Sequence, residues 1–155
     1  MRFLLVASAC LSAILLNAVA QLANATTPPL GRGHVAELVN GLSKCAGVYE
    51  VAARLNDDGG KPANATTWRD TARGARYAAI YLLTLEGGVS GTLVKPFAEY
   101  ASDVDPLIEV STTQIMALVE KNDGAAVEAE MKTCVALMDL QRKIVEQMRD
   151  AINDR

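Results

Sequence analysis

Apolar residues recur every three or four positions through four separate stretches of this chain, a spacing that places them on one face of a helix. The stretches cover residues 34–55, 68–86, 95–121 and 124–152. Aromatic residues make up 5% of the 155 residues, which is few for a β-sheet core. A chain of this length forms one domain. The pattern therefore predicts an all-α fold, an up-down-up-down four-helix bundle.

Polar segments separate the expected helices. Residues 56–60 are expected to stop the first helix, and residues 61–66 are expected to form a loop. Thr67, followed three residues later by Asp70, has the spacing of a cap at a helix start. In the second helix, Gly74 lies beside several alanines, and small residues of this kind indicate that another helix approaches closely.

The third stretch contains Pro106, which can be accommodated in two ways. The apolar spacing continues without interruption through the proline, which predicts one helix over residues 95–121 with a kink near Pro106. The alternative is two helices, the second capped by Asp105 with Pro106 at its first position. Asp123 is available to cap the last helix.

Two cysteines lie on the apolar faces of the first and last expected helices. Cys45 lies 10 residues before Leu55, and Cys134 lies 11 residues after Asp123. If these two helices are antiparallel, the cysteines are about 15 Å and about 16.5 Å from the same end of the bundle. We therefore expect a disulfide between Cys45 and Cys134 that joins the first and last helices.

The N-terminus has the pattern of a secretory signal peptide. A basic residue, Arg2, precedes an apolar run over residues 3–16 and the small-residue site that ends at Ala20. Residues 1–20 are expected to be removed, with Ala25 marking an alternative cleavage site. Residues 21–33 are then an extended arm and residues 34–155 the helical domain, in a periplasmic or secreted protein with no stable membrane anchor after processing.

Composition and motifs argue against several classes of function. The formal net charge is −3 and the isoelectric point about 5.2, so the basic surface needed for nucleic-acid binding is missing. The sequence contains neither a nucleophile motif nor a spacing of metal ligands, and its single histidine is His34. We expect a non-catalytic protein without a metal or other cofactor.

A stripe of arginines is the candidate binding site. Arg69, Arg73 and Arg76 recur at helical spacing, with Tyr77 nearby, and such a face can bind a carboxylate, a phosphate or an acidic loop of a partner. The alternative is a structural role, because residues 61–95 carry a net charge of +3 and residues 96–130 a net charge of −7. These neighbouring elements can neutralise each other.

A haem site is the alternative to a protein-binding role. Some four-helix bundles hold haem between a histidine and a methionine of the first and last helices. Here His34 and Met148 would differ in depth by about one helical turn. A small-molecule or haem carrier is therefore the second functional hypothesis.

In size, export and cysteine number, the chain resembles small all-helical periplasmic proteins with one disulfide, among them immunity proteins that neutralise cell-wall-cutting effectors. The resemblance implies a non-catalytic module that binds an envelope or secreted protein partner, as an immunity protein or inhibitor does. It extends to no motif, so it implies no site residue. Asn24 and Asn64 each begin an N-glycosylation sequence in an expected loop, which has meaning only in a eukaryotic source.

Overall fold

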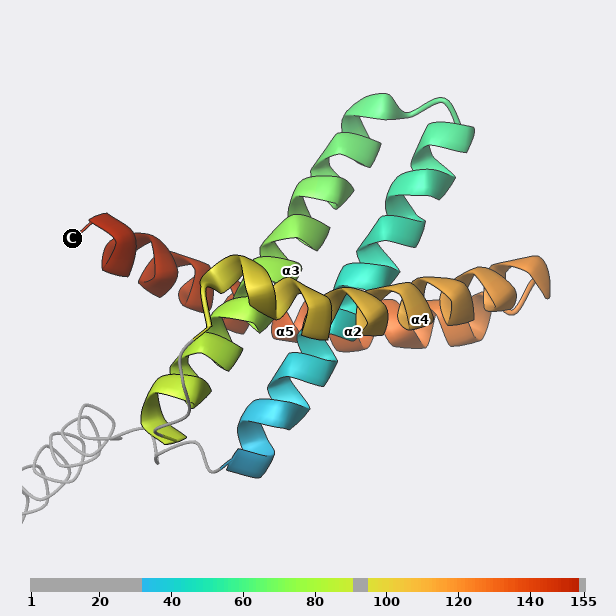
Figure 1. Cartoon of the computed structure of the whole chain (residues 1–155). Coiled ribbons are helices and arrows are strands. Elements are labelled where there is room, and N and C mark those ends of the chain that lie inside the picture. The colour runs from blue at the N-terminus through green and yellow to red at the C-terminus, as the bar shows by residue number, and fades with distance from the viewer. Residues whose placement is uncertain (1–31, 91–94, 154–155) are drawn as a thin grey trace, which may run out of the picture. The chain divides into compact units, whose positions relative to one another are not determined.

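The structure is a computed structural model that describes residues 32–90 and 95–153, and in these residues it contains helices and no strands. Successive long helices reverse direction (Figure 1). The predicted all-α class and the four-helix up-down-up-down order are confirmed. The elements are α2 (Arg32–Asp58), α3 (Pro62–Ser90), the 3-10 turn η1 (Phe97–Tyr100), α4 (Ala101–Glu120) and α5 (Gly124–Asn153).

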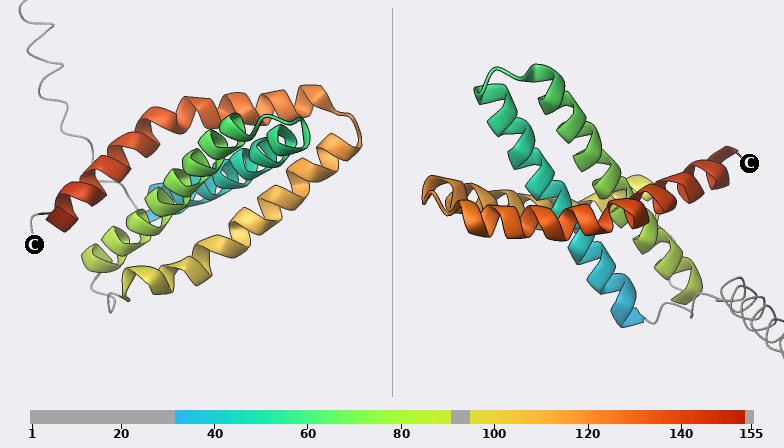
Figure 2. Two further views of the ribbon diagram at one scale, coloured as in Figure 1. Left: turned by 90° about the horizontal axis from the view of Figure 1, so that it is seen from above. Right: turned by 180° about the vertical axis from the view of Figure 1, so that it is seen from behind.

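The four helices form two hairpins that cross each other. In the first hairpin α2 and α3 lie side by side and form the most extensive helix pair, while α4 and α5 form the second hairpin. Figure 2 shows that α4 lies on one face of the α2–α3 hairpin and α5 on the opposite face. The second hairpin therefore holds the first between its two helices.

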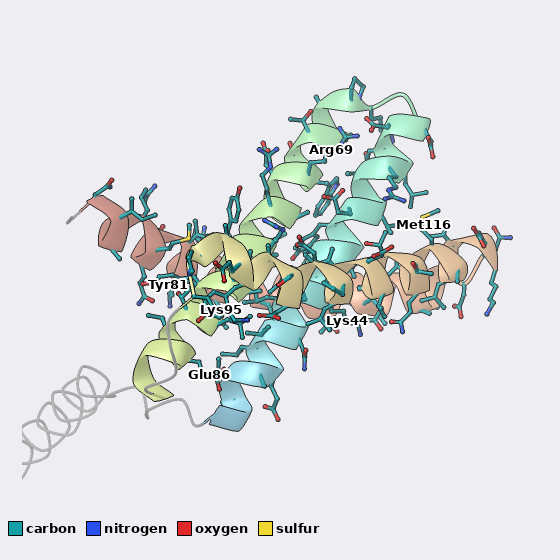
Figure 3. The ribbon with its side chains drawn as sticks, in the orientation of Figure 1. Lys44, Arg69, Tyr81, Glu86, Lys95 and Met116 are labelled. Carbon is teal, nitrogen blue, oxygen red and sulfur yellow. A yellow bond between two sulfur atoms is a disulfide. The ribbon has the colours of Figure 1, made fainter. Side chains whose placement is uncertain are left out.

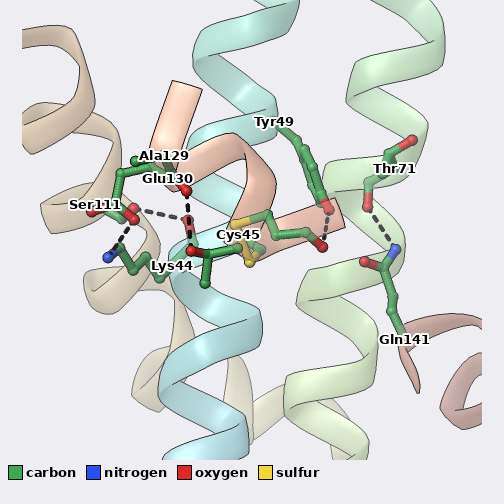
Figure 4. The surroundings of a disulfide bond; sticks show 10 residues. Lys44, Cys45, Tyr49, Thr71, Ser111, Ala129, Glu130 and Gln141 are labelled. Atoms are coloured by element: carbon green, nitrogen blue, oxygen red, sulfur yellow. Dashed lines mark hydrogen bonds and ion pairs between the residues drawn. A yellow bond between two sulfur atoms is a disulfide. The ribbon is translucent and has the colours of Figure 1, made fainter. Parts of the chain in front are cut away.

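The crossing of α2 and α4 depends on a glycine. A Cβ atom at Gly47 would lie 2.7 Å from the Cβ atom of Ser111 and 2.8 Å from the backbone nitrogen of Thr112. The hydroxyl of Ser111 donates a hydrogen bond of 2.8 Å to the carbonyl oxygen of Lys44 (Figure 4). Gly47 therefore lets the backbone of α4 approach α2 closely enough for this polar contact.

At the crossing of α3 and α5, a glycine makes room for a polar side chain instead of a backbone. A Cβ atom at Gly74 would lie 2.8 Å from Nε2 of Gln141, which donates a hydrogen bond of 3.0 Å to the carbonyl oxygen of Thr71 (Figure 4). The close helix neighbour expected beside Gly74 is therefore α5. Gln141 is buried although it is polar, because its amide nitrogen has a hydrogen-bond partner.

The predicted disulfide is confirmed. Cys45 of α2 and Cys134 of α5 are bonded, their Cα atoms lie 5.2 Å apart, and both are buried. The hydroxyl of Tyr49 donates a 2.9 Å hydrogen bond to the carbonyl oxygen of Cys134, and the ring of Tyr49 stacks on Trp68 at 5.6 Å. An ion pair between Lys44 and Glu130 joins the same two helices at the protein surface.

The expected loop over residues 61–66 is wrong, because α3 begins at Pro62. Proline is favourable at the first position of a helix, where no backbone N–H bond is lost. Gly60, with a φ of 68°, makes the tight turn that allows this early start. Thr67 is therefore inside the helix, where its hydroxyl donates to the carbonyl of Ala63 instead of capping a helix start. Asn64 also lies in α3 and not in a loop.

The other end of α3 also differs from expectation, since the helix continues to Ser90 instead of ending at residue 86. Pro106 lies inside α4, which confirms a helix that continues through this residue and not the two-helix alternative. The expected start at residue 95 is wrong, because α4 begins at Ala101, after the 3-10 turn η1. α4 ends at Glu120, and Asn122 in the following turn has a φ of 55°. Asp123 then caps α5 by accepting a 3.1 Å hydrogen bond from the backbone N–H of Ala126.

The predicted signal peptide, residues 1–20, lies outside the described residues, as does most of the predicted arm over residues 21–33. The last two arm residues differ from expectation, because Arg32 and Gly33 belong to the first turn of α2. The preceding prolines end at Pro29, so nothing in the sequence prevents helical backbone there. In the described part of the chain, none of the helices combines the length and hydrophobicity needed to span a membrane.

Candidate functional site

The predicted arginine stripe lies on α3, and each arginine has an acidic partner. Arg69, labelled in Figure 3, pairs with Asp57 of α2. Arg73 pairs at 2.9 Å with Asp70 of its own helix, and both of these side chains are more than 60% exposed. An exposed pair one turn apart contributes little to stability, so Arg73 is free to exchange its partner.

Arg76 is held most firmly of the three. Its Nε and Nη2 atoms donate hydrogen bonds of 2.6 Å and 2.9 Å to the two carboxylate oxygens of Asp105 on α4. The hydrogen bonds that Arg76 donates to Asp105 raise the pKa of Arg76 above its usual value, against the lowering effect of burial. This two-pronged pair joins α3 to α4, as the complementary charges of the two segments predicted.

Tyr77 lies at the edge of the same surface. Its ring contacts Phe97 in a tilted arrangement at 6.2 Å, and the guanidinium of Arg76 lies 5.9 Å from the ring centre. Tyr77 is 36% exposed and Phe97 is 38% exposed. The two rings thus form a small aromatic surface beside the Arg76–Asp105 pair.

A cleft lies where α4 crosses over the α2–α3 hairpin, with a volume of about 490 Å³ and one side open to solvent. This volume is in the range of small-molecule sites. It contains Arg73 and Arg76 of the predicted stripe but neither Arg69 nor Tyr77. The lining residues are Ala46, Glu50 and Arg54 of α2, Ala72, Arg73 and Arg76 of α3, and Asp105, Ile108, Glu109, Thr112 and Thr113 of α4.

The cleft contains charged groups that no other part of the described structure neutralises. Arg54 is exposed, Glu50 is half-buried and Glu109 is exposed, and no hydrogen bond or ion pair engages their side chains among residues 32–90 and 95–153. Arg73 has only its exposed partner on α3. The cleft therefore offers two cations and two carboxylates that can still bind a ligand.

Arg54 and Glu50 are not among the site residues predicted from the sequence, and Glu109 was predicted only as one of the acidic residues of the segment 96–130. The helix period shows that Ala46, Glu50 and Arg54 share one face of α2, but it does not show which helix lies over that face. The only local signal is Gly47, next to Ala46, where the close approach of α4 begins. Residues from three helices meet here because of the crossing, which the pattern of a single helix does not specify.

A second cleft, of about 480 Å³, lies at the turn between α4 and α5 and is mainly apolar. Val119, Val127 and Met131 form its apolar part. Within the described residues no group of three or more histidine, cysteine, aspartate or glutamate side chains is placed to hold a metal ion. Of the two residues considered for haem, His34 is exposed at the start of α2 and Met148 is half-buried on α5.

No protein-family model matches the chain, and the searches of curated proteins and of solved structures found no similar protein.

Proposed function

We propose that this protein is an exported, non-catalytic binding module that holds an envelope or secreted protein partner at the cleft between α2, α3 and α4. The observation that carries the proposal is the pair of available arginines, Arg54 and Arg73, at the border of this cleft. Arginine is favoured at protein interfaces because its planar guanidinium donates several hydrogen bonds to one carboxylate. The partner therefore places an acidic group against these two residues.

The disulfide supports the exported part of the proposal. Disulfides persist in oxidising compartments, and the Cys45–Cys134 bond is buried at the centre of the helix crossing. Together with the signal-peptide pattern of residues 1–20, it favours a periplasmic or secreted location. An inhibitor-like or immunity-like role fits a small rigid module of this kind, whose charged cleft is fixed on three helices.

The ion pairs of the arginines suggest which residues to change in a test of this proposal. Arg69 and Arg76 each join two helices, whereas Arg54 and Arg73 do not. The variant Arg54→Glu/Arg73→Glu should therefore lose partner capture from the envelope or culture fraction of the source. Its melting temperature should remain within a few degrees of the wild type, because exposed charges contribute little to stability.

The matched control is Lys143→Glu/Arg149→Glu, which reverses two exposed basic residues of α5 that have no ion-pair partner in the described structure. It changes the net charge by the same amount. The wild type, the cleft variant and the control variant each serve as bait, and quantitative mass spectrometry compares the proteins that they capture. A partner that the control retains and the cleft variant loses supports the proposal, whereas a partner that all three retain equally rejects the cleft as its binding site.

A further inference from the structure

The α4 wall of the cleft offers hydrogen-bond acceptors only. The hydroxyl groups of Thr112 and Thr113 donate to the carbonyl oxygens of Ile108 and Glu109 on the same helix, at 2.8 Å and 2.9 Å. Their oxygen atoms can therefore only accept a hydrogen bond from a ligand. The carboxylate of Glu109 is an acceptor as well. A ligand group that faces α4 must be a donor.

The α2–α3 floor has a different chemistry. Arg54 and Arg73 supply donors and positive charge, while the alanines Ala46 and Ala72 form a buried apolar base between the two helices. Glu50 of α2 adds one carboxylate to the floor. A ligand group that contacts Arg54 and Arg73 must be an acceptor, and a carboxylate matches the geometry of a guanidinium.

The mixed charges of the cleft disfavour a ligand whose charges are all of one sign. The lining contains three arginines and three carboxylates, and one of each is already paired as Arg76 and Asp105. A purely anionic ligand would be repelled by Glu50 and Glu109, and a purely cationic ligand by Arg54 and Arg73. An uncharged ligand would form no ion pair with Arg54, Glu50 or Glu109.

We infer that the cleft binds a short peptide segment that carries both a cationic and a carboxylate side chain. The cationic side chain faces Glu109, Thr112 and Thr113 on α4, and the carboxylate binds Arg54 and Arg73 on the hairpin. This inference rests on the proposed function, since it describes the part of the partner that enters the cleft. The inference is more specific than the proposed function, because it requires the partner to carry a cationic side chain and a carboxylate close together.

The test uses blocked peptides as probes in a nuclear magnetic resonance titration of the isotope-labelled protein. The charged probe is N-acetyl-lysyl-aspartyl-amide, and the controls are N-acetyl-lysine amide, N-acetyl-aspartate amide and the uncharged N-acetyl-glutaminyl-asparaginyl-amide. The charged dipeptide should shift backbone signals of the cleft residues and bind about tenfold more tightly than either singly charged probe. Tenfold corresponds to about 1.4 kcal/mol, the scale of one or two ion pairs.

Variants locate the two ends of the probe. Glu109→Gln and Arg54→Gln should each weaken binding of the charged dipeptide by about threefold or more. Glu146→Gln, on an exposed position of α5 with no ion pair in the described residues, is the matched control and should leave binding unchanged. The inference is overturned if the dipeptide binds no more tightly than the aspartate probe. It is also overturned if the dipeptide binds Glu109→Gln and the wild type with equal affinity.

Different experimental results would contradict this inference and the proposed function. If the dipeptide does not bind but Arg54→Glu/Arg73→Glu still abolishes partner capture, the cleft binds a protein of other chemistry and only the inference fails. If the dipeptide binds at the cleft but capture is unaffected by that variant, the inference stands and the proposed protein-binding function fails.

Discussion

At the scale of single residues, Tyr49 connects the disulfide to the aromatic core. Its side chain is fully buried, its hydroxyl donates to the backbone of Cys134, and its ring stacks on Trp68. Burial raises the pKa of Tyr49 to about 12, because the charged phenolate would lose its hydration. The folded state therefore keeps this proton at a pH where the unfolded chain has released it.

This difference makes stability depend on pH in the alkaline range. The unfolded tyrosine ionises near pH 10 and the folded one near pH 12, so the contribution of Tyr49 is complete below about pH 10 and is lost as the pH rises toward 12. Relative to Tyr49→Phe, the wild type should lose about 2–3 kcal/mol of unfolding free energy between these values. Urea unfolding at several pH values measures the difference, and parallel curves for the two proteins would contradict it.

At the scale of the helices, two glycines and two polar side chains define where the hairpins cross. Gly47 and Gly74 lie at the two crossings, and Ser111 and Gln141 each hydrogen-bond a carbonyl of the facing helix. A polar side chain with one such partner favours a single helix register, because sliding the helix would leave the polar group buried and unpaired.

Gly47 should therefore tolerate no side chain. In Gly47→Ala the new methyl group would meet the backbone of α4 and force this helix outward. We expect a loss of about 1–3 kcal/mol, although alanine favours the helix itself by up to about 1 kcal/mol. Chemical denaturation followed by circular dichroism measures the change.

Gly33→Ala is the matched control, because the Cβ position of Gly33, also in α2, has no neighbouring atom within 4 Å. It should be neutral or slightly stabilising. Equal stability of the two variants would show that α2 and α4 are not in close contact at Gly47.

The helices and the disulfide could be predicted from the sequence because their signals are local or come from one pair of residues. The apolar spacing identified α2, α3, α4 and α5, and it placed Cys45 and Cys134 on the buried faces of the first and last helices. The antiparallel alignment assumed for these two helices is wrong, because α5 crosses α2 (Figure 1). The start of α3 was missed, because the cap signal of Thr67 and Asp70 was preferred to Pro62. The cleft was missed because its lining comes from three helices, which tertiary packing brings together and no local pattern encodes.

At the scale of the whole domain, the disulfide joins residues that are 89 positions apart. Replacing both cysteines in Cys45→Ala/Cys134→Ala should reduce the free energy of unfolding by about 2–5 kcal/mol, because the unfolded chain regains its freedom. The double variant avoids a free thiol. Thermal unfolding at neutral pH measures the loss, and an unchanged melting temperature would show that helix packing alone determines stability.

The position of the disulfide also determines what a protease can achieve. The turn after α4 contains a lysine, Lys121, and this turn lies between Cys45 and Cys134. Cleavage after Lys121 therefore produces two pieces that stay covalently linked through the disulfide. A molecule cut in this way remains one molecule and keeps α2 attached to α5.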